Sequence, residues 1–314
     1  MTIITDTFET YDVNNIPEEK MEKIYMFERE ETPVYSSAKK MKCESTSPQW
    51  QNYNLRAAGD NIRVQGDELT PIARTATNFV KNHTQILWDV ISITGTNQAV
   101  KHYGQADLMA WEKGQAVKAL KRDIERAIVQ NNASVAGSTG VAGECGGIET
   151  WITTNVSRGA GGSNGGYNSG TGLTVAPTDG TQRAFTEDLY LATRQLMYDN
   201  GAKASEIHLS PFNRRKMSAF NGSTTRTSDK EKKITNTIDF YEDDYGVISC
   251  KTNPRQRTRT AILYDMDGVG VFELRNEKGK KGKTHDSNEE YILFELTSMV
   301  VEKSLGIIAD LTTS

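Results

Sequence analysis

The stretch from Ala106 to Gln130 has the pattern of one long amphipathic helix. Its apolar residues recur at spacings of three, four and seven, which places them along a single helical face: Ala110, Val117, Leu120, Ile124 and Ile128. At the rise of an α-helix, about 25 residues span about 37 Å, which is unusual for a compact domain. The pattern therefore favours an elongated protein built along a helical spine.

The predicted helix also contains a possible ion pair and a central glycine. Lys121 and Glu125 have the spacing of an i,i+4 ion pair, so both are expected on the polar face. Gly114 lies near the middle and weakens the helix by about 1 kcal/mol relative to alanine. Neither detail changes the prediction of a single long helix.

The segments before the helix cannot bury much apolar surface by themselves. Residues 1–35 are polar and acidic, and they are predicted to form an extended arm that becomes ordered against another surface. Residues 39–83 contain two strand-like stretches, at 50–55 and 75–80, which predict a long hairpin with a loose tip. Because an isolated hairpin is only marginally stable in water, we expect this one to lie on a neighbour.

The segments after the helix mix strands and helices. Residues 157–172 are rich in glycine and serine and hold too little apolar surface to offset the entropy of ordering. A second helix is predicted from its N-cap at Thr186 to Asn200-Gly201, and a third begins at Pro211. Strand-like stretches occupy residues 206–210, 234–250, 260–274 and 290–301. Within 260–274, the alternation at 260–264 and 270–274 brackets a predicted hairpin turn at Asp265–Gly268. The fold class is therefore α+β.

Composition excludes several classes of protein. Apolar residues make up only 36% of the 314 residues and the mean hydropathy is −0.58, so much of the chain must be solvated or covered by a partner. The formal net charge of −4 is too small for a dedicated nucleic-acid binder. Cys43, Cys145 and Cys250 stand far apart, which is typical of a reducing cytoplasm. The N-terminus has no secretion signal, and no apolar run approaches the roughly 20 residues of a membrane span.

One short run, Gly279–Thr284, ends in Gly-Lys-Thr as a nucleotide-binding P-loop does. A P-loop needs a glycine five residues before its Gly-Lys pair, and Glu277 stands there instead. A P-loop also joins a strand to a helix, whereas the residues after this run, 290–301, are strand-like. We interpret the run as a solvated basic loop between two strands.

No other motif predicts catalysis. Gly161–Gly165 fits G-x-S-x-G, but it lies in the glycine-rich stretch rather than between a strand and a helix. The four histidines, at positions 83, 102, 208 and 285, have no metal-ligand spacing. The acidic run Asp239–Asp244 lacks the alternating oxygen ligands of a calcium loop and is interpreted as a solvated edge. The sequence therefore predicts no enzyme, no cofactor and no metal site.

A basic cluster formed by Arg255, Arg257 and Arg259 has two interpretations. It could contact phosphates, as in a nucleic-acid-binding module. It could equally be a charged loop that pairs with the acids of Asp239–Asp244, in the same chain or in another copy.

The order of these elements resembles that of the major capsid proteins of tailed bacteriophages with the Hong Kong 97-type fold. Several stretches resemble a podovirus-type capsid family more specifically: Glu31–Pro33 with Trp50, Lys121–Glu125, Thr153–Gly162, Arg183–Glu187, Ser210–Asn213, Lys283–Thr284 with Asp286–Ser287, Glu290–Leu296 and Gly306–Leu311. The resemblance covers nearly the whole chain, and only the first 30 residues contribute little to it.

The resemblance implies four parts. They are an N-arm at residues 1–40, an extended E-loop at 41–85, a P-domain at 86–140 and 260–303 that contains the spine helix, and an A-domain at 141–259 and 304–314. No extra scaffold domain precedes the arm, so the resemblance also implies a separate scaffolding protein.

The implied function is that of the repeated subunit of an icosahedral head, assembled in the host cytoplasm and enclosing the double-stranded DNA of a tailed phage. Its expected partners are other copies of itself in hexamers and pentamers, a scaffolding protein, a portal protein, a decoration protein and the packaged DNA. No membrane is expected. The alternatives are a nucleic-acid-binding module at Arg255–Arg259 and a P-loop-like enzyme at Gly279–Thr284.

The hairpin is the element expected to make contacts between subunits. Its aromatic residues Trp50 and Tyr53 belong to types that often anchor interfaces, yet the element is too thin to bury them on both faces. Charged residues on it are expected to fix the register of the contact: Arg56, Arg63, Asp67 and Glu68. We expect the hairpin to reach over the spine helix of an adjacent subunit. The alternative is a hairpin that folds onto its own domain.

Overall fold

The long helix predicted from apolar periodicity is present as α3, Leu108–Val129. The computed structural model describes residues 30–68, 71–102, 104–105, 107–220, 239–281 and 286–313. The side chain of Asp107 caps α3 by accepting a hydrogen bond from the backbone N–H of Ala110 at 3.1 Å. The predicted stripe is confirmed at Leu120, Ile124 and Ile128, which are buried. Ala110 is exposed and its neighbour Met109 is buried instead, so the buried face begins one residue away from the position that the spacing indicated.

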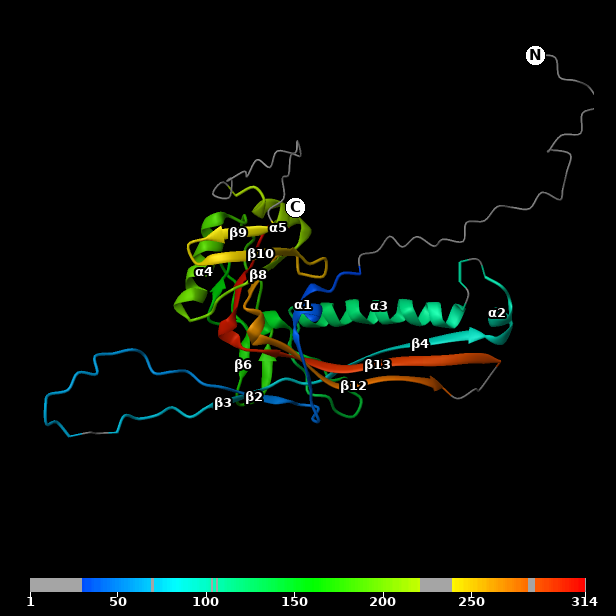
Figure 1. Ribbon diagram of the computed structural model, residues 1–314, viewed down its shortest axis with the longest axis horizontal. Helices are drawn as coiled ribbons and strands as arrows, with labels where there is room; N and C mark the ends of the chain where they lie inside the picture. The colour runs from blue at the N-terminus through cyan, green and yellow to red at the C-terminus, as the bar shows by residue number, and fades with distance from the viewer. Residues whose placement is uncertain are drawn as a thin grey trace, which may run out of the picture.

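A four-stranded sheet runs alongside α3 and makes the molecule elongated (Figure 1). Its strands, in spatial order, are β1 (Lys39–Lys42), β12 (Val269–Lys281), β13 (Ser287–Val300) and β4 (Gln85–Thr94). β1 is parallel to β12, and the other neighbours are antiparallel. The long C-terminal strand predicted from residues 290–301 is confirmed as β13.

A second, six-stranded sheet lies near the C-terminus in Figure 1. Its order is β5 (Val156–Ser157), β14 (Leu305–Ile308), β11 (Ala261–Tyr264), β8 (Glu206–Leu209), β10 (Gly246–Thr252) and β9 (Phe240–Asp243). Two helices pack on it, α4 (Glu187–Asp199) and α5 (Pro211–Met217).

The predicted ends of α4 and α5 are confirmed. Thr186 caps α4 by accepting from the backbone N–H of Leu189, and Gly201 has a φ of +87°, as a glycine after a helix commonly does. Pro211 occupies the first turn of α5, where its missing N–H costs nothing.

The predicted hairpin consists of β2 (Gln49–Asn52) and β3 (Asn78–Lys81), which pair with each other alone. Between them, the described residues of the loop 53–77 form neither helix nor strand. Figure 1 shows this loop projecting away from the rest of the chain, on the side opposite to the far ends of β4 and β13. The loose tip expected from the sequence is therefore larger than the paired part.

Short elements complete the fold. They are the helices α1 (Pro33–Ser37) and α2 (Gly95–Ala99), the 3-10 turns η2 (Ile148–Thr150), η4 (Met266–Gly268) and η5 (Glu302–Ser304), and the pair β6 (Gly166–Asn168) and β7 (Leu173–Val175). β6 and β7 place two strands at the glycine-rich stretch, which was expected to lack enough apolar surface to become ordered. The predicted arm up to residue 29 lies outside the described residues.

The expected hairpin at residues 260–274 needs correction. The turn at Asp265–Gly268 is present, but the strands on either side do not form a hairpin with each other, because β11 lies in the six-stranded sheet and β12 in the four-stranded sheet. β11 pairs with β8 and β14. The side chains of β11 face both ways: Ile262 and Tyr264 belong to the core that contains α3, and Ala261 and Leu263 belong to the core that contains α4 and α5.

The buried residues form two cores. One lies between α3 and the four-stranded sheet and extends to α1, the hairpin base and Trp151; it includes Val34, Trp50, Ile124, Ile292 and Phe294. The other lies between the six-stranded sheet and the helices α4 and α5; it includes Tyr190, Met197, Ile207, Met217 and Ile248. No described residue of the loop 53–77 belongs to either core.

Candidate interaction surfaces

The motifs that resemble enzyme sites lack the structure that catalysis requires. Gly279–Lys281 belong to β12, and the Gly-Lys-Thr triplet itself lies outside the described residues. The structure places β13 after it, rather than the helix that a P-loop needs. Ser163 forms an isolated bridge with Thr178 and does not stand between a strand and a helix.

Neither a metal site nor a membrane helix is found in the described part of the chain. Among those residues, no group of three histidine, cysteine or acidic side chains is arranged to hold an ion. No described helix combines the length and apolar character needed to cross a bilayer. His208 is in β8 and fully buried, where its Nε2 lies 3.0 Å from Glu206 Oε2.

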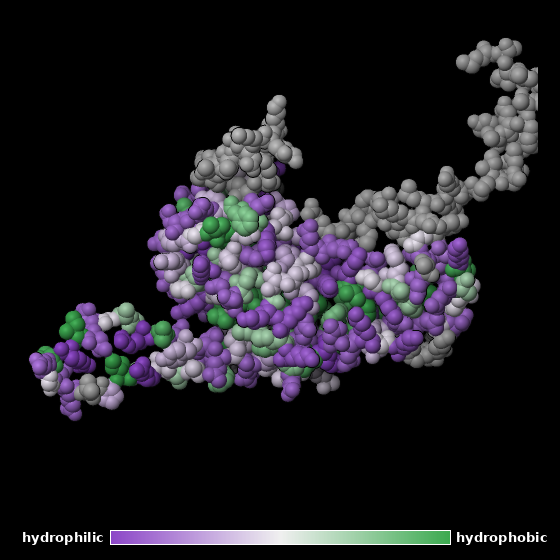
Figure 2. Space-filling view, viewed as in Figure 1, coloured by the Kyte–Doolittle hydropathy of each residue, from purple (hydrophilic) through white to green (hydrophobic). Residues whose placement is uncertain are grey.

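The loop 53–77 is the most exposed apolar segment of the described chain. Leu55, Ile62 and Val64 are 86%, 86% and 81% exposed, and Tyr53 is 49% exposed. Figure 2 shows apolar residues spaced among hydrophilic ones along this loop. A segment with this exposure gains nothing from burial in its own chain, and such surfaces mark sites of interaction.

The four charged residues predicted on the loop are also exposed: Arg56, Arg63, Asp67 and Glu68. Arg63 and Asp67 lie 3.5 Å apart and form an ion pair within the loop itself. Because both side chains are about half exposed, this pair contributes little to stability. The charges therefore remain accessible to a partner.

Trp50, predicted to contact another subunit, lies instead in the core of its own chain. It is only 8% exposed, its ring centroid lies 5.2 Å from that of Trp151, and its Nε1 donates to the carbonyl oxygen of Val300 at 3.2 Å. The expectation of an intersubunit anchor at this position is therefore corrected. The base of the hairpin is covered by the underlying sheet, and only the loop beyond it is thin and unsupported.

Two arginines of the predicted basic cluster form ion pairs within their own chain. Arg257 binds Glu149 at 2.7 Å and Asp179 at 2.5 Å. Arg259 binds Asp310 at 3.2 Å. Within the chain, neither pairs with the acids of Asp239–Asp244. A contact of these arginines with phosphate or with another copy stays a prediction.

Arg255 lies beside this network and is half-buried, and its backbone N–H donates to Asn253 Oδ1 at 2.9 Å. It is not the exposed side chain that a contact with phosphate or with another subunit was expected to use.

The acidic run Asp239–Asp244 is not simply a solvated edge. Asp243 is buried and accepts from Tyr190 Oη at 2.6 Å and from Arg194 Nε at 2.9 Å. The Arg194 and Asp243 side chains are 3% and 1% exposed. Burial and the hydrogen bond to Asp243 raise the pKa of Tyr190 far above its ordinary value. This part of the run therefore ties β9 to α4.

Sequence reasoning missed a buried carboxylate that joins three segments. Glu125 on α3 accepts from the backbone N–H groups of Val34 and Tyr35 at 3.0 and 2.7 Å. It also accepts from Asn253 Nδ2 at 2.6 Å. Burial raises the pKa of Glu125, and the three donors oppose that effect. The residue was expected on the polar face as a partner of Lys121, and the structure corrects this.

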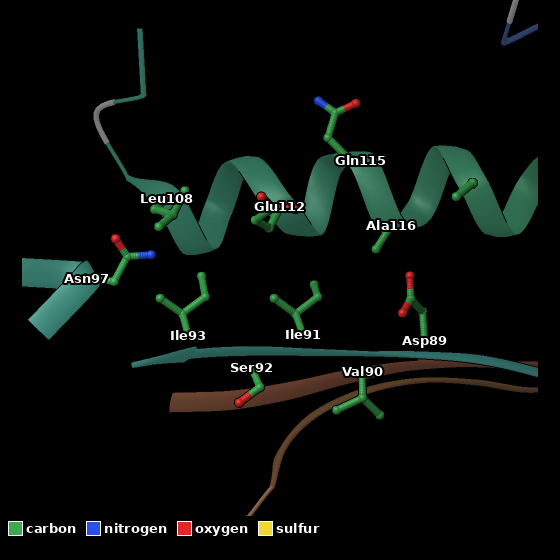
Figure 3. Close-up of a pocket in the computed structure, with 11 residues that line it drawn as sticks. Asp89, Val90, Ile91, Ser92, Ile93, Asn97, Leu108, Glu112, Gln115 and Ala116 are labelled. Atoms are coloured by element: carbon green, nitrogen blue, oxygen red, sulfur yellow. The ribbon is translucent and has the colours of Figure 1, made fainter. Parts of the chain in front are cut away.

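A groove of about 480 Å³ lies between α3 and β4. Figure 3 shows Ile91 and Ile93 pointing from β4 toward the helix, while Val90 and Ser92 point to the opposite side of the sheet. Ile91 and Ile93 make the floor of the groove apolar, and the acidic side chains of Asp89 and Glu112 also line it. The alternation along β4 therefore divides the sheet into a helix-covered face and a second face.

Comparisons with known proteins agree over nearly the full length of the chain. The family described as SU10 major capsid protein matches residues 3–312. The major capsid protein of Escherichia phage Phieco32 is 26% identical over 127 residues, which are 40% of this chain and 36% of that protein. The match thus spans about a third of the length of that curated relative.

Solved capsid structures share the fold. The capsid asymmetric unit of cyanophage A-1(L) has a TM-score of 0.68 at 12% identity, covering 98% of this chain and 99% of that one. The capsid of cyanophage P-SCSP1u has a TM-score of 0.60 at 12% identity, covering 99% and 97%. The capsid of a native GTA particle has a TM-score of 0.63 at 11% identity, covering 96% and 98%. These similarities confirm the α+β, Hong Kong 97-type fold.

Proposed function

We propose that this chain, which belongs to the SU10 major capsid protein family and is a shell-forming head protein, holds its shell together through the loop 53–77. The observation that carries the proposal is the exposure of that loop: Leu55, Ile62 and Val64 are each more than 80% exposed. Three such side chains in a segment whose described residues form neither strand nor helix need a partner, because burying each one fully is worth about 1.5–3 kcal/mol. The partner is another copy of the same chain.

Symmetry supports this assignment. In a closed shell every copy presents the same loop and the same receiving surface, so one favourable contact is repeated throughout the particle. We assign the loop and hairpin to an E-loop, the layer of α3 with the four-stranded sheet to a P-domain, and the six-stranded sheet to an A-domain. Copies would assemble as hexamers and pentamers.

Further partners follow from a role in a phage head. They are a scaffolding protein, a portal protein, a decoration protein and packaged double-stranded DNA, with assembly in the host cytoplasm. The chain contributes no enzymatic activity in this proposal. Support comes from the P-loop-like and G-x-S-x-G runs, which lack the helix that each site requires.

The test replaces the exposed apolar residues of the loop with serine, as Leu55→Ser, Ile62→Ser and Val64→Ser together. The unassembled subunit should unfold at the wild-type denaturant concentration, because none of the three side chains is buried in its own chain. Shells should fail to close or should dissociate at lower denaturant. Val141→Ser, which changes a 51% exposed valine elsewhere, is the matched control.

Two outcomes would overturn the proposal. One is a set of triple-variant shells as stable as those of the wild type. The other is a triple-variant subunit that unfolds much earlier, which would make the loop part of its own subunit's core.

A further inference from the structure

The groove between α3 and β4 is open because the helix carries small side chains above it. Ala116 and Ala119 line it from α3, and Ile91 and Ile93 line it from β4, where Figure 3 shows the two isoleucines pointing toward the helix. Two methyl groups are too short to fill the space above this apolar floor, so about 480 Å³ stays accessible. Since packed elements of a protein normally leave few gaps of this size, the groove can receive a further segment of polypeptide.

The chain that leads to this groove is anchored on α3 by Glu125. Its carboxylate accepts from the backbone N–H groups of Val34 and Tyr35, in the first turn of α1. In the described part of the chain, the N-cap residue Thr32 makes no capping hydrogen bond with its side chain. Glu125 therefore caps α1 from another helix, because the first N–H groups of a helix need an acceptor. This contact fixes the start of α1 beside the C-terminal half of α3.

From α1 the chain runs back along α3 toward the groove. Tyr35 lies at Glu125, and Glu30 lies at Lys118, where Glu30 Oε1 accepts from Lys118 Nζ at 2.9 Å. Five residues of the chain thus pass seven residues of the helix, which is about 10 Å of its length. Lys118 lies one turn from Gln115, which lines the groove. The described chain therefore begins at the rim of the groove.

The residues directly before Glu30 are rich in apolar side chains. Ile24–Phe27 is an unbroken run of isoleucine, tyrosine, methionine and phenylalanine, and we name it the apolar run. It suits an irregular apolar groove, because aromatic side chains bury large areas and methionine adapts to uneven spaces. Residues 20–29 thus have the chemistry that the floor of the groove requires.

Residues 20–29 are also long enough to fill the groove. From Lys118 to Leu108, at the far end of the groove, the distance along α3 is about 15 Å, and ten residues cover it even as a helix. At the pace seen between Tyr35 and Glu30, the apolar run passes the stretch of α3 between Leu108 and Ala116. Figure 3 shows Ile91 and Ile93 beneath that stretch.

The charges of the groove and of this segment are complementary. Asp89 and Glu112 line the groove. Lys113, the residue after Glu112, pairs instead with Glu290 of β13. Lys23 directly precedes the apolar run, and the same pace along α3 brings it within a turn of Glu112. An ion pair at this point would fix the register of the segment more than it adds affinity.

The segment of the same chain has an advantage over any other occupant. Glu30 is already held at the rim, so the preceding residues are tethered beside the groove. Tethering gives them an effective concentration in the millimolar range, which a free segment of another copy would have to exceed. This favours a contact within one subunit.

We propose that residues 20–29 dock in the groove between α3 and β4 of their own chain, with the apolar run on its floor and Lys23 beside Glu112. The contact lies within one subunit and does not depend on the function proposed for the loop 53–77. Asn97 of α2 lines the far end of the groove. Docking therefore leaves only residues 1–19 for contact with another surface and directs them out at the α2 end of the sheet.

The experiment places a photo-crosslinking amino acid at Gln115 and irradiates unassembled subunits in a mixture of isotopically labelled and unlabelled chains. Mass spectrometry should find the crosslink on a peptide within residues 20–29 that carries the same label as position 115. The same crosslinker at Trp88 is the control. Trp88 is 65% exposed and lies on the other face of β4, so it should not reach that peptide.

Two outcomes would overturn the docking. One is the absence of any crosslink from position 115 to residues 20–29. The other is a crosslink that joins chains of different label, which would assign the groove to a segment of another copy. Neither outcome bears on the loop 53–77, whose test compares assembled shells.

A charge exchange gives an independent test of the register. Lys23→Glu and Glu112→Lys should each lower the yield of the crosslink by about fivefold or more, because like charges then meet in the groove. The double variant should recover most of the yield. Circular dichroism of each variant checks that α3 stays folded, so that a lost crosslink reports a lost contact. Unchanged yield in both single variants would refute the placement of Lys23 beside Glu112.

Discussion

Replacing Trp50 with alanine should destabilise the isolated subunit rather than the shell contact alone. Trp50 is 8% exposed and belongs to the core between the hairpin base, Trp151 and the four-stranded sheet. Its Nε1 donates to the backbone of Val300, which is itself fully buried. The variant thus removes a large side chain and leaves a buried carbonyl without this donor.

The magnitude follows from that environment. A buried tryptophan changed to alanine costs about 3–5 kcal/mol, through lost burial and the cavity that remains. Loss of the aromatic contact with Trp151, about 0.5–1.5 kcal/mol, falls within this range. Against a typical unfolding free energy of about 5–15 kcal/mol, such a loss is a large fraction of the stability.

Urea unfolding of the unassembled subunit measures this effect, and the chain supplies a matched control. Trp88→Ala removes the same side chain from a position that is 65% exposed, so its cost to the subunit should be within about 0.5 kcal/mol. Equal unfolding midpoints for Trp50→Ala and the wild type would refute this reasoning. They would instead favour a role for Trp50 in the contact between subunits.

Three further predictions concern single sites. Arg194→Ala should cost about 3–5 kcal/mol in urea unfolding, because it leaves the Asp243 carboxylate buried without its cation; a loss under about 1 kcal/mol would contradict this. The pKa of Glu206 is lowered from 4.5 to about 2, first by its hydrogen bond with His208. Its stabilising contribution is therefore complete above pH 4.5 and is lost as the pH falls toward 2, so Glu206→Gln should flatten the loss of subunit stability over that window. An unchanged slope would count against it. Lys283→Ala should leave ATP binding and assembly as in the wild type, and saturable ATP binding that only the wild type shows would refute our interpretation of the basic run.

The parts of the fold that were predictable from the sequence are those set by local patterns. The helix α3 carries its own apolar periodicity, and α4 has its cap and its terminal glycine within a few residues of its ends. The hairpin was predictable for the same reason, because its two paired strands, β2 and β3, lie in short strand-like stretches separated by a polar segment. Each of these signals is contained in a window of about 10–25 residues, which is the range in which such patterns operate.

Side-chain partners could not be predicted, because they come from distant segments. Glu125 and Lys121 have the spacing of a surface ion pair, yet α1 and Asn253 reach Glu125 from segments about 90 and 130 residues away and bury it. Trp50 belongs to a thin hairpin, and only the position of β12 and β13 beneath it makes it a core residue. The spacing of residues along the chain does not show which distant segments pack on Glu125 or on Trp50.

The loop 53–77 was predicted only in part. A loose tip was expected, but the sequence placed strands at 50–55 and 75–80, whereas β2 ends at Asn52 and β3 begins at Asn78.

The central claim, that this chain is the repeated subunit of a shell, is tested most directly by imaging the purified protein by electron microscopy across a range of concentrations. The account predicts hexamers, pentamers and sheets or closed shells built from them. A protein that stays a uniform monomer or dimer at every concentration, with and without a co-expressed scaffolding protein, would contradict the account.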